Sequence, residues 1–416
     1  MSRWLVVVQS EPDTDHLLAA VYRSAERGQQ IEVWVTSYPT SQMWHRLRLI
    51  EPFKNVKIRL RPIPRSSDGI VNRILRLRHC RPILVRSLER GKFTLIIHEW
   101  WDGIDEPKPP LFKRIQNYFF RQFSLQIQLA ALKLRIPVVA LPHGHSLKDA
   151  SIASKQAQLI AIEGGGRLPF QNRDSFAAYV VAHESDRKFL TEKTTMSGHN
   201  IRVWGSARFS PQWVELLYST SRKPMSPCTK KSSLKILFFL PKWNNSIHRQ
   251  ETINLLSALS SIANIELWIR EHPRQGESCL TSVERCELIG HKSVVFIKRE
   301  IDTIDLIREC DVMIEIESSI AIDAVLMGKR LIMPRYLQEG GVHSRFDQSL
   351  CITITKSCDE TIQLVTKSGR VVEPDSHFLA EIAAQLLENQ LELYDHRLRE
   401  VEQMFTCQSF GASAFE

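Results

Sequence analysis

Residues 311–334 read DVMIEIESSIAIDAVLMGKRLIMP and carry the signals of a strand, a turn, a helix and a second strand. The mostly apolar run at 312–316 is typical of a strand that is buried on both faces of a sheet. Apolar positions at 320–326 follow a helical spacing, and 330–334 return to a strand pattern. The stretch therefore predicts a β-α-β unit, the building block of a parallel α/β fold.

The turn inside this stretch has the composition of an anion-binding helix start. Ser318 and Ser319 follow Glu317, and their hydroxyls can cap the first backbone N–H groups of the helix. Such N–H groups can also hold a phosphate, although an ordinary capping serine produces the same pattern. Asp323 lies one helical turn further on, and Gly328 supplies the left-handed residue with which many helices end.

The same alternation of strands and helices runs through the rest of the chain, and no internal repeat is apparent. Strands are expected at residues 4–9, 31–36, 56–60, 93–98, 137–141, 159–162, 179–182, 201–204, 234–240, 265–270, 293–297, 311–316, 330–333 and 351–355. Helices are expected at 14–27, 70–89, 111–134, 185–194, 251–262, 303–308, 319–327 and 360–366. This order predicts an α/β fold with two doubly wound, Rossmann-like domains facing a central cleft.

The chain length of 416 residues also favours two domains. Residues 219–233, STSRKPMSPCTKKSS, are rich in Ser, Pro and Lys and predict a linker. An N-terminal domain is then expected at 1–218 and a C-terminal domain at 234–375. Residues 376–416 form a tail in which apolar side chains recur at helical spacing, so we expect one long amphipathic helix there.

Composition places the protein in the soluble, cytoplasmic class. Hydrophobic residues make up 43% of the chain, yet no window approaches the roughly 18 apolar residues of a membrane span. The apolar run at the amino terminus is too short for a signal peptide. The eight cysteines include no CxxC pair, which favours reduced thiols and predicts no metal site.

Positive charge is concentrated in one segment. Residues 54–92 contain twelve Lys or Arg and only two acidic residues, interleaved with apolar positions. This pattern predicts a basic amphipathic helix that would attract an anionic membrane surface or another polyanion, or that simply forms a solvated face. We do not expect nucleic acid as a partner, because no binding motif or aromatic platform accompanies the charge.

Polar signals follow several of the predicted strands. His143 and Gly144 come directly after the run at 137–141, where a histidine is well placed as a general base. Arg208 follows the last strand of the first half and could make a bidentate phosphate contact. A loop histidine and a surface arginine without any role fit the same patterns.

Two further signals lie at strand ends. Arg270 and His272 are two residues apart in an extended segment, so their side chains point the same way before Pro273 stops the strand. His98 and Glu99 end the strand at 93–98, and with the aromatic residues after them they are candidates for contact with an acceptor substrate.

The order of these signals resembles that of the GT-B-type CDP-glycerol glycerophosphotransferase and capsular polysaccharide transferase group. That family has a His-Gly motif followed by lysine, then Gly-x-Pro-Arg, Arg-x-His-Pro, and an Asp-x-Ser-Ser turn ahead of an acidic residue and Gly-Lys-Pro. The matching positions here are His143, Gly144 and Lys148; Gly205 and Arg208; Arg270, His272 and Pro273; and Glu317, Ser318, Ser319, Asp323, Gly328 and Lys329. This sequence departs at Ala207, Glu315, Glu317 and Arg330, which puts the identity of the donor in doubt.

The resemblance implies a GT-B-like transferase that moves a glycosyl or glycerol-phosphate unit from a nucleotide sugar or CDP-polyol to a glycan or lipid-linked acceptor. It assigns His143 as the catalytic base and places Lys148 on the acceptor side, in the N-terminal domain. Arg208, Arg270, His272 and the turn from Glu317 to Asp323 would hold the donor. No cofactor and no metal are implied, and the C-terminal helix is expected to pack back on the N-terminal domain.

Two other functions fit the same sequence. A nucleotide-sugar epimerase of similar architecture would bind its nucleotide in the same way but would need several carboxylates around the sugar. A non-catalytic scaffold for polysaccharide synthesis, attached to the inner face of the plasma membrane, would need neither His143 nor a nucleotide.

Overall fold

The computed structural model describes residues 2–62, 81–100, 123–142, 144, 155–220, 233–243, 245–271, 280–291, 293–298, 300–316, 318–338, 352–366 and 390–412. The chain forms two compact units. The first comprises Met1–Lys148, Ile160–Ser210 and Leu386–Glu416, and the second comprises Asp149–Leu159 and Pro211–Gln385. Each contains one parallel sheet, so the predicted α/β class with two Rossmann-like domains is confirmed.

The first unit is built on a seven-stranded sheet in the order β3-β2-β1-β4-β5-β6-β7, in which all pairs are parallel. Its strands are β1 (Arg3–Val8), β2 (Gln30–Val35), β3 (Val56–Leu60), β4 (Leu95–Glu99), β5 (Val138–Leu141), β6 (Ala178–Val181) and β7 (Ile201–Val203). The order reverses between β1 and β4. Such a reversal defines the switch point where ligands of doubly wound sheets bind.

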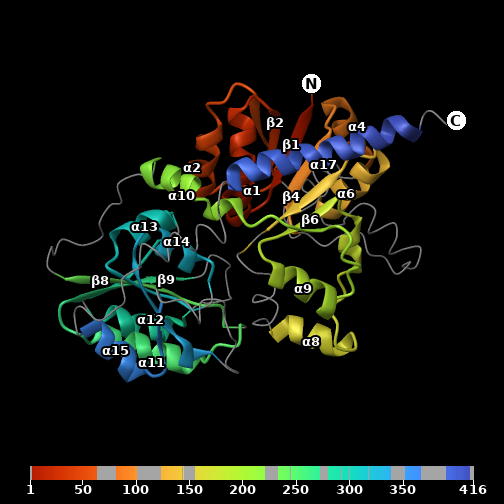
Figure 1. Cartoon of the computed structure of the whole chain (residues 1–416). Helices are drawn as coiled ribbons and strands as arrows, with labels where there is room; N and C mark the ends of the chain where they lie inside the picture. Colours follow the sequence, from red (N-terminus) through yellow and green to blue (C-terminus); the bar gives the residue numbers. More distant parts are fainter. Residues whose placement is uncertain are drawn as a thin grey trace, which may run out of the picture. The chain divides into compact units, whose positions relative to one another are not determined.

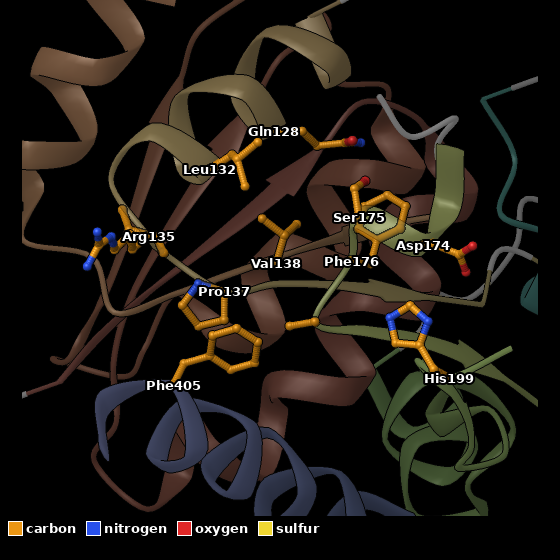
Figure 2. Close-up of a pocket in the computed structure, with 12 residues that line it drawn as sticks. Gln128, Leu132, Arg135, Pro137, Val138, Asp174, Ser175, Phe176, His199 and Phe405 are labelled. Carbon is orange, nitrogen blue, oxygen red and sulfur yellow. The ribbon is translucent and has the colours of Figure 1, made fainter. Parts of the chain in front are cut away.

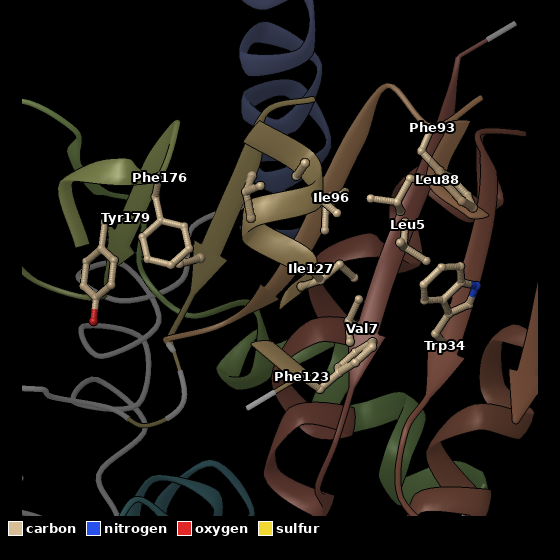
Figure 3. Close-up of a cluster of buried hydrophobic side chains, with 14 of the residues drawn as sticks. Leu5, Val7, Trp34, Leu88, Phe93, Ile96, Phe123, Ile127, Phe176 and Tyr179 are labelled. Carbon is tan, nitrogen blue, oxygen red and sulfur yellow. The ribbon is translucent and has the colours of Figure 1, made fainter. Parts of the chain in front are cut away.

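Helices cover both faces of this sheet. Its helices are α1 (Glu11–Glu26), α2 (Ser41–Ile50), α4 (Arg81–Gly91), α6 (Phe123–Lys133), α8 (Lys155–Glu163), α9 (Glu184–Lys193) and α17 (Gln390–Ala412), with α8 spanning the boundary between the units. Successive strand residues face opposite sides, so Leu5 and Val7 pack on α4 and α6 in the core shown in Figure 3. Trp4 faces the other side, where its indole Nε1–H donates to Glu402 of α17 over 3.0 Å.

The C-terminal helix α17 belongs to the first unit and lies along α1 (Figure 1). Arg27, which follows α1, donates to Asp395 over 2.7 Å, and both Arg23 and Arg27 pair with Glu392. Only the helical part of the tail from Gln390 onward is among the described residues. The chain thus returns from the second unit to complete the first.

The second unit contains a six-stranded parallel sheet in the order β10-β9-β8-β11-β12-β13. Its strands are β8 (Leu234–Phe239), β9 (Ile265–Arg270), β10 (Val294–Phe296), β11 (Val312–Ile314), β12 (Arg330–Pro334) and β13 (Ile352–Thr355). Its helices are α10 (Pro211–Thr220), α11 (Arg249–Ser260), α12 (Ser282–Ile289), α13 (Thr303–Glu309), α14 (Ile320–Leu326) and α15 (Cys358–Thr366). Ile236 and Phe238 pack on α11, α12 and α15, whereas α13 and α14 lie on the opposite face (Figure 1).

Most expected strands are present within a residue or two, but several features differ from prediction. Residues 159–162, expected as a strand, belong to the helix α8. Helices α2 and α12 were not anticipated, although Thr40 and Thr281 cap them through side-chain oxygens that accept from Met43 and Glu284. Helix α10 groups with the second unit, whereas we had placed its residues in the N-terminal domain.

The two units also share a buried Trp–Glu hydrogen bond that was not predicted from the sequence. In β2 the indole Nε1–H of Trp34 donates to Glu32 over 2.7 Å, and in β9 that of Trp268 donates to Glu266 over 2.6 Å. Each strand lies next to the first strand of its sheet in chain order, β1 or β8, and is second from the edge on the same side of the order. Ile-Glu-Val-Trp-Val at 31–35 and Ile-Glu-Leu-Trp-Ile at 265–269 are therefore structurally equivalent.

The basic segment at 54–92 is only partly among the described residues. Arg59 pairs with Glu32 over 2.6 Å, and the guanidinium of Arg61 stacks over Trp34 with 3.7 Å from Cζ to the ring centroid. Leu84 and Leu88 anchor α4 in the core. Attraction of this segment to a membrane surface stays a prediction, and no described helix is both long and apolar enough to cross a bilayer.

Candidate functional site

The carboxyl ends of parallel strands meet at one edge of a sheet, and both sheets carry polar loops there. In the second unit the switch point lies between β8 and β11, so the loop after β8 and the turn after β11 flank it. In the first unit the loops after β1 and β4 have the same relation.

The turn after β11 is held by a buried carboxylate. Glu315 is fully buried, and its Oε2 accepts a hydrogen bond from the main-chain N–H of Ser318 over 2.7 Å. The hydroxyl of Ser318 in turn accepts from the N–H of Ile320 over 3.4 Å. These two bonds fix the backbone of the turn and leave the half-buried side chains of Ser318 and Ser319 at the sheet edge.

Other residues of the predicted donor turn have supporting positions. Ser319 precedes α14 as its N-cap residue but makes no capping bond with its side chain, so the expected double serine cap is not formed. Asp323 is buried in α14 and offers little surface to a ligand. Gly328 has the expected left-handed conformation, with φ of +67°.

Arg270 ends β9, and its guanidinium is directed at the neighbouring loop. It donates to the main-chain carbonyl oxygens of Lys298 and Ile301, the latter over 3.3 Å, and the residue is only 6% exposed. Arg270 therefore positions the loop after β10 at the sheet edge. Its direct contact with a phosphate stays a prediction.

Sequence reasoning missed two side chains at the switch point of the second sheet. Lys242 and Trp243 follow β8, the central strand, and both are half-buried. The guanidinium of Arg249 lies over the Trp243 ring at 5.5 Å. The signal was a Pro-Lys-Trp triplet directly after an apolar strand run, which places a cation and an aromatic plane where ligands bind.

In the first unit the loop after β1 is organised by Asp13. Its Oδ2 accepts from the main-chain N–H groups of Gln9 and Ser10 over 2.7 and 2.9 Å, and its Oδ1 accepts from the Ser10 hydroxyl over 2.6 Å. Asp13 is fully buried in the first turn of α1. This network resembles a capping box and rigidifies the loop at the switch point.

His98 is the penultimate residue of β4, beside this loop, and is fully buried. Its Nδ1 donates to the carbonyl oxygen of Glu99 over 2.6 Å, and its ring meets that of Phe176 edge-on at 5.2 Å. Burial lowers the pKa of His98 to about 4, and the Glu99 carbonyl and the Asp13 carboxylate offset only part of this effect. The ring is therefore neutral at pH 7. Because it is buried, it offers no surface to an acceptor and has a packing role at the carboxyl edge of the sheet. The half-buried Glu99 remains a candidate for contact with an acceptor.

The loop after β7 carries Arg208 and is fastened from two sides. Gly205 has φ of +82°, and its carbonyl oxygen accepts from the Tyr394 hydroxyl of α17 over 2.7 Å. Ser206 Oγ lies 3.2 Å from Nδ1 of the buried His16 in α1. Arg208 itself is half-buried, with its guanidinium 5.1 Å from the ring centre of Phe209.

The remaining predicted site residues, His143, Lys148, His272 and Glu317, lie outside the described residues. Their roles stay predictions. Among the described residues no group of three or more His, Cys, Asp or Glu side chains could hold a metal ion.

An exposed aromatic at the first sheet's carboxyl edge was also missed. Tyr38, which follows β2, is 80% exposed, although large apolar rings are usually covered. Its ring could stack on a sugar or a base. The sequence offered only a Tyr-Pro turn as a sign of it.

No protein-family model matches the sequence, and no curated protein matches it either. Solved structures do match over nearly the whole chain. UDP-GlcNAc 2-epimerase from Neisseria meningitidis bound to UDP-GlcNAc aligns with a TM-score of 0.58 at 12% identity, covering 98% of this chain and 100% of that one. The chain has a GT-B-like fold.

Two further matches have the same architecture. The S. aureus MnaA–UDP complex aligns with a TM-score of 0.55 at 12% identity, covering 96% of this chain and 95% of that one. A glycosyltransferase from Rickettsia africae aligns with a TM-score of 0.53 at 11% identity, covering 97% and 98%. These identities establish the fold alone. They support the predicted GT-B class but give no support to the narrower CDP-glycerol glycerophosphotransferase group.

Proposed function

We propose that this protein is a nucleotide-sugar enzyme that binds the diphosphate of its substrate at the carboxyl edge of the second sheet. The observation that carries the proposal is the turn after β11, where Glu315 fixes the backbone N–H of Ser318 at the switch point. Ser318 and Ser319 supply hydroxyls, and Lys242 supplies positive charge from the loop after β8. The bound nucleotides named in the two UDP complexes of this fold support the same assignment.

A nucleotide diphosphate carries negative charge that must be met by fixed donors or cations when water is excluded. Helix α14 has only seven residues, so its dipole alone is a weak partner. The hydroxyls of Ser318 and Ser319 and the ammonium of Lys242 would together hold the diphosphate, with Arg270, Arg208 and His272 as further candidates.

We propose epimerisation of the sugar as the reaction, since UDP-GlcNAc 2-epimerase from Neisseria meningitidis matches nearly the whole chain and an epimerase needs carboxylates near its sugar. Glu11, the first residue of α1, and Glu99, the last residue of β4, flank the switch point of the first unit, and both are half-buried. Inversion at C2 would begin with one group removing the C2 proton while the C1–O bond to UDP breaks, and would end with another group returning a proton to C2 as the bound UDP adds back to C1. Two carboxylates that flank one switch point are suited to these two proton transfers.

Transfer is the second candidate. The ordered motifs that include His143 favour it, and the glycosyltransferase from Rickettsia africae has the same fold. In that case His143 would take the proton of an acceptor hydroxyl on a glycan or lipid-linked acceptor, and Lys148 would lie on the acceptor side. A nucleotide sugar or a CDP-polyol would be the donor, with no metal required.

Binding is tested first. A thermal-shift screen of CMP, CDP, UDP and GDP should raise the melting temperature with one diphosphate, because a ligand that binds only the folded state stabilises it. Ser318→Ala should reduce that shift, whereas Ser261→Ala, in an exposed serine that ends α11, should leave it unchanged. The proposal fails if no nucleotide diphosphate changes the melting temperature at millimolar concentration.

The reaction is tested next, with UDP-GlcNAc in D₂O and proton NMR of the product. Epimerisation through proton removal would give the C2 epimer with deuterium at C2 and no release of UDP. Transfer would release UDP only when an acceptor is added. Glu11→Gln and Glu99→Gln should abolish the first outcome, whereas His143→Ala should abolish the second.

A further inference from the structure

A pocket of about 480 Å³ lies in the first unit at the amino edge of its sheet, the edge opposite to the candidate site (Figure 2). It opens where β5 begins and where the chain enters β6. The turn before β7 and the last part of α17 complete its wall. Its lining includes Leu132, Arg135, Pro137, Val138, Phe176 and Phe405.

The floor of this amino-edge pocket is apolar and partly aromatic. Val138 and Phe176 are buried in the core, at 7% and 3% exposure. Phe405 of α17 remains 36% exposed, and Figure 2 shows its ring beside Pro137. An aromatic and aliphatic lining of this kind fits an aromatic ring, because burial of apolar area and aromatic contacts both favour it.

Polar groups stand at the two ends. Figure 2 shows Arg135 at one end and His199 with Asp174 at the other. The His199 end is fixed, since Asp174 Oδ2 accepts from the N–H of Ser197 over 2.9 Å and the Ser197 hydroxyl contacts Nδ1 of His199. Arg135 is exposed, and no described residue pairs with its guanidinium.

The backbone of Arg135 adds a second observation. It is the residue at which the chain leaves α6, with φ of +55°, and its N–H donates to Leu132 while that of Ile136 donates to Ala131. Glycine is favoured at this position of a helix end, because a side chain there costs conformational energy. Lys92 has the same conformation after α4, with φ of +50°, and contacts no part of the pocket.

We propose that the amino-edge pocket binds a small aromatic anion, with the ring on the floor formed by Pro137, Phe176 and Phe405 and the negative group paired with Arg135. Volume supports this class, since pockets for small molecules span roughly 300–1,000 Å³. The guanidinium suits a carboxylate or a phosphate, with which it forms charge-assisted hydrogen bonds. Nucleoside monophosphates and aromatic carboxylic acids share this chemistry.

The site does not depend on the proposed function, because it lies at the other edge of the sheet from the loops after β1 and β4. A ligand there would contact the amino ends of β5 and β6 and the end of α17. The same helix holds the Gly205 carbonyl through Tyr394. Helix α17 therefore connects a ligand in the pocket with the loop that carries Arg208.

Isothermal titration calorimetry of the full chain with AMP and, separately, with indole-3-acetate tests the proposal. Arg135→Gly removes the cation at no cost to the backbone and should weaken binding of the active probe about tenfold. Lys92→Gly makes the same backbone change away from the pocket and should leave the affinity unaltered. A probe that binds elsewhere, including at the proposed diphosphate site, would respond equally to both changes.

A second pair of variants tests the apolar lining of the pocket. Leu132 lines the pocket at 62% exposure, so Leu132→Glu should fold normally and exclude an anion, weakening binding at least tenfold. Leu159→Glu, at 61% exposure on α8, is the matched control and should have no effect. Binding of AMP alone identifies a nucleotide site, and binding of indole-3-acetate alone identifies an aromatic-acid site. The proposal is overturned if neither probe binds at 5 mM or if Arg135→Gly and Leu132→Glu bind as the wild type does.

Discussion

The phenolic hydroxyl of Tyr394 in α17 donates a hydrogen bond to the carbonyl oxygen of Gly205 over 2.7 Å. The ring of Trp204 meets that of Tyr394 edge-on at 5.7 Å, which adds an aromatic contact to the same attachment. A residue near the end of the chain thereby fixes the loop that carries Arg208. Because Tyr394 is fully buried, its pKa lies well above the ordinary value for tyrosine, and the hydroxyl stays protonated in any buffer that keeps the protein folded.

Tyr394→Phe should remove this bond and leave the buried Gly205 carbonyl without its donor. We expect the free energy of unfolding to fall by about 1–2 kcal/mol, as measured by urea denaturation. Tyr218→Phe is the control, since Tyr218 is 46% exposed and its loss should change stability by less than about 0.5 kcal/mol. Equal losses in the free energy of unfolding would mean that the hydrogen bond to Gly205 contributes no more than an exposed tyrosine hydroxyl does.

His98 predicts a pH dependence of stability. Its folded pKa of about 4 lies below the ordinary value of 6.5, so the unfolded chain binds the proton more readily. The contribution of the neutral ring to stability is complete above pH 6.5 and is lost as the pH falls toward 4, by about 3 kcal/mol in total.

This dependence is measured as the difference between wild type and His98→Gln in urea unfolding at pH 7.5, 6.0 and 4.5. The difference should shrink or reverse toward the acidic end, because the variant lacks the titrating ring. His199→Gln, on an exposed histidine, should follow the wild-type curve. A wild-type curve parallel to that of His98→Gln would show that the buried ring is not neutral as described.

Much of the architecture could be predicted from sequence because apolar runs identify strands that are buried on both faces. Strand β9 was predicted without error, and β11 with its following turn and Gly328 were recognised as a unit. The error at residues 159–162 has a physical cause. The run Leu-Ile-Ala-Ile is apolar enough for a strand, but in α8 it leaves Leu159 and Ile162 largely exposed.

The candidate site was less predictable, because a strand end locates a side chain without saying which way its functional group points. Arg270 and His98 were both identified at strand ends. The structure gives Arg270 two main-chain carbonyls and buries His98 against Phe176. Lys242 was passed over because nothing in its local sequence shows that β8 is the central strand of its sheet.

The Trp–Glu hydrogen bonds in β2 and β9 can be tested by substitution of their partners. Trp268→Phe removes the donor to the buried Glu266 carboxylate, so the free energy of unfolding should fall by about 2–3 kcal/mol. The double variant Glu266→Gln with Trp268→Phe should recover part of that loss, because the uncompensated charge is gone. A double-mutant cycle measured by urea denaturation gives the coupling energy, expected to be about 1 kcal/mol or more.

The equivalent cycle on Glu32 and Trp34 provides the comparison. Glu32 also pairs with Arg3 and Arg59, each over 2.6 Å, so other cations remain when the indole is removed. The coupling between Glu32 and Trp34 should therefore be smaller than that between Glu266 and Trp268. The reverse order would indicate that the extra cations do not share in holding the buried carboxylate.

Glu315 gives the sharpest test of the proposed diphosphate site, because it contributes an acceptor to the turn while its charge opposes a phosphate. Glu315→Ala removes the acceptor for the Ser318 N–H, and we expect UDP to bind about tenfold more weakly. Glu315→Gln keeps an acceptor oxygen and removes the negative charge, so UDP affinity should be retained or increased.

Calorimetric titration with UDP measures both variants, and urea denaturation checks that each remains folded. Glu309→Ala serves as the control, since that carboxylate lies at the end of α13 and is 4.0 Å from Lys235, at the start of β8 on the opposite edge of the sheet. A purely structural role for Glu315 would make the two Glu315 variants lose UDP affinity in proportion to their stability. Recovery of binding in Glu315→Gln, at unchanged or lower stability, would instead tie the turn itself to the nucleotide.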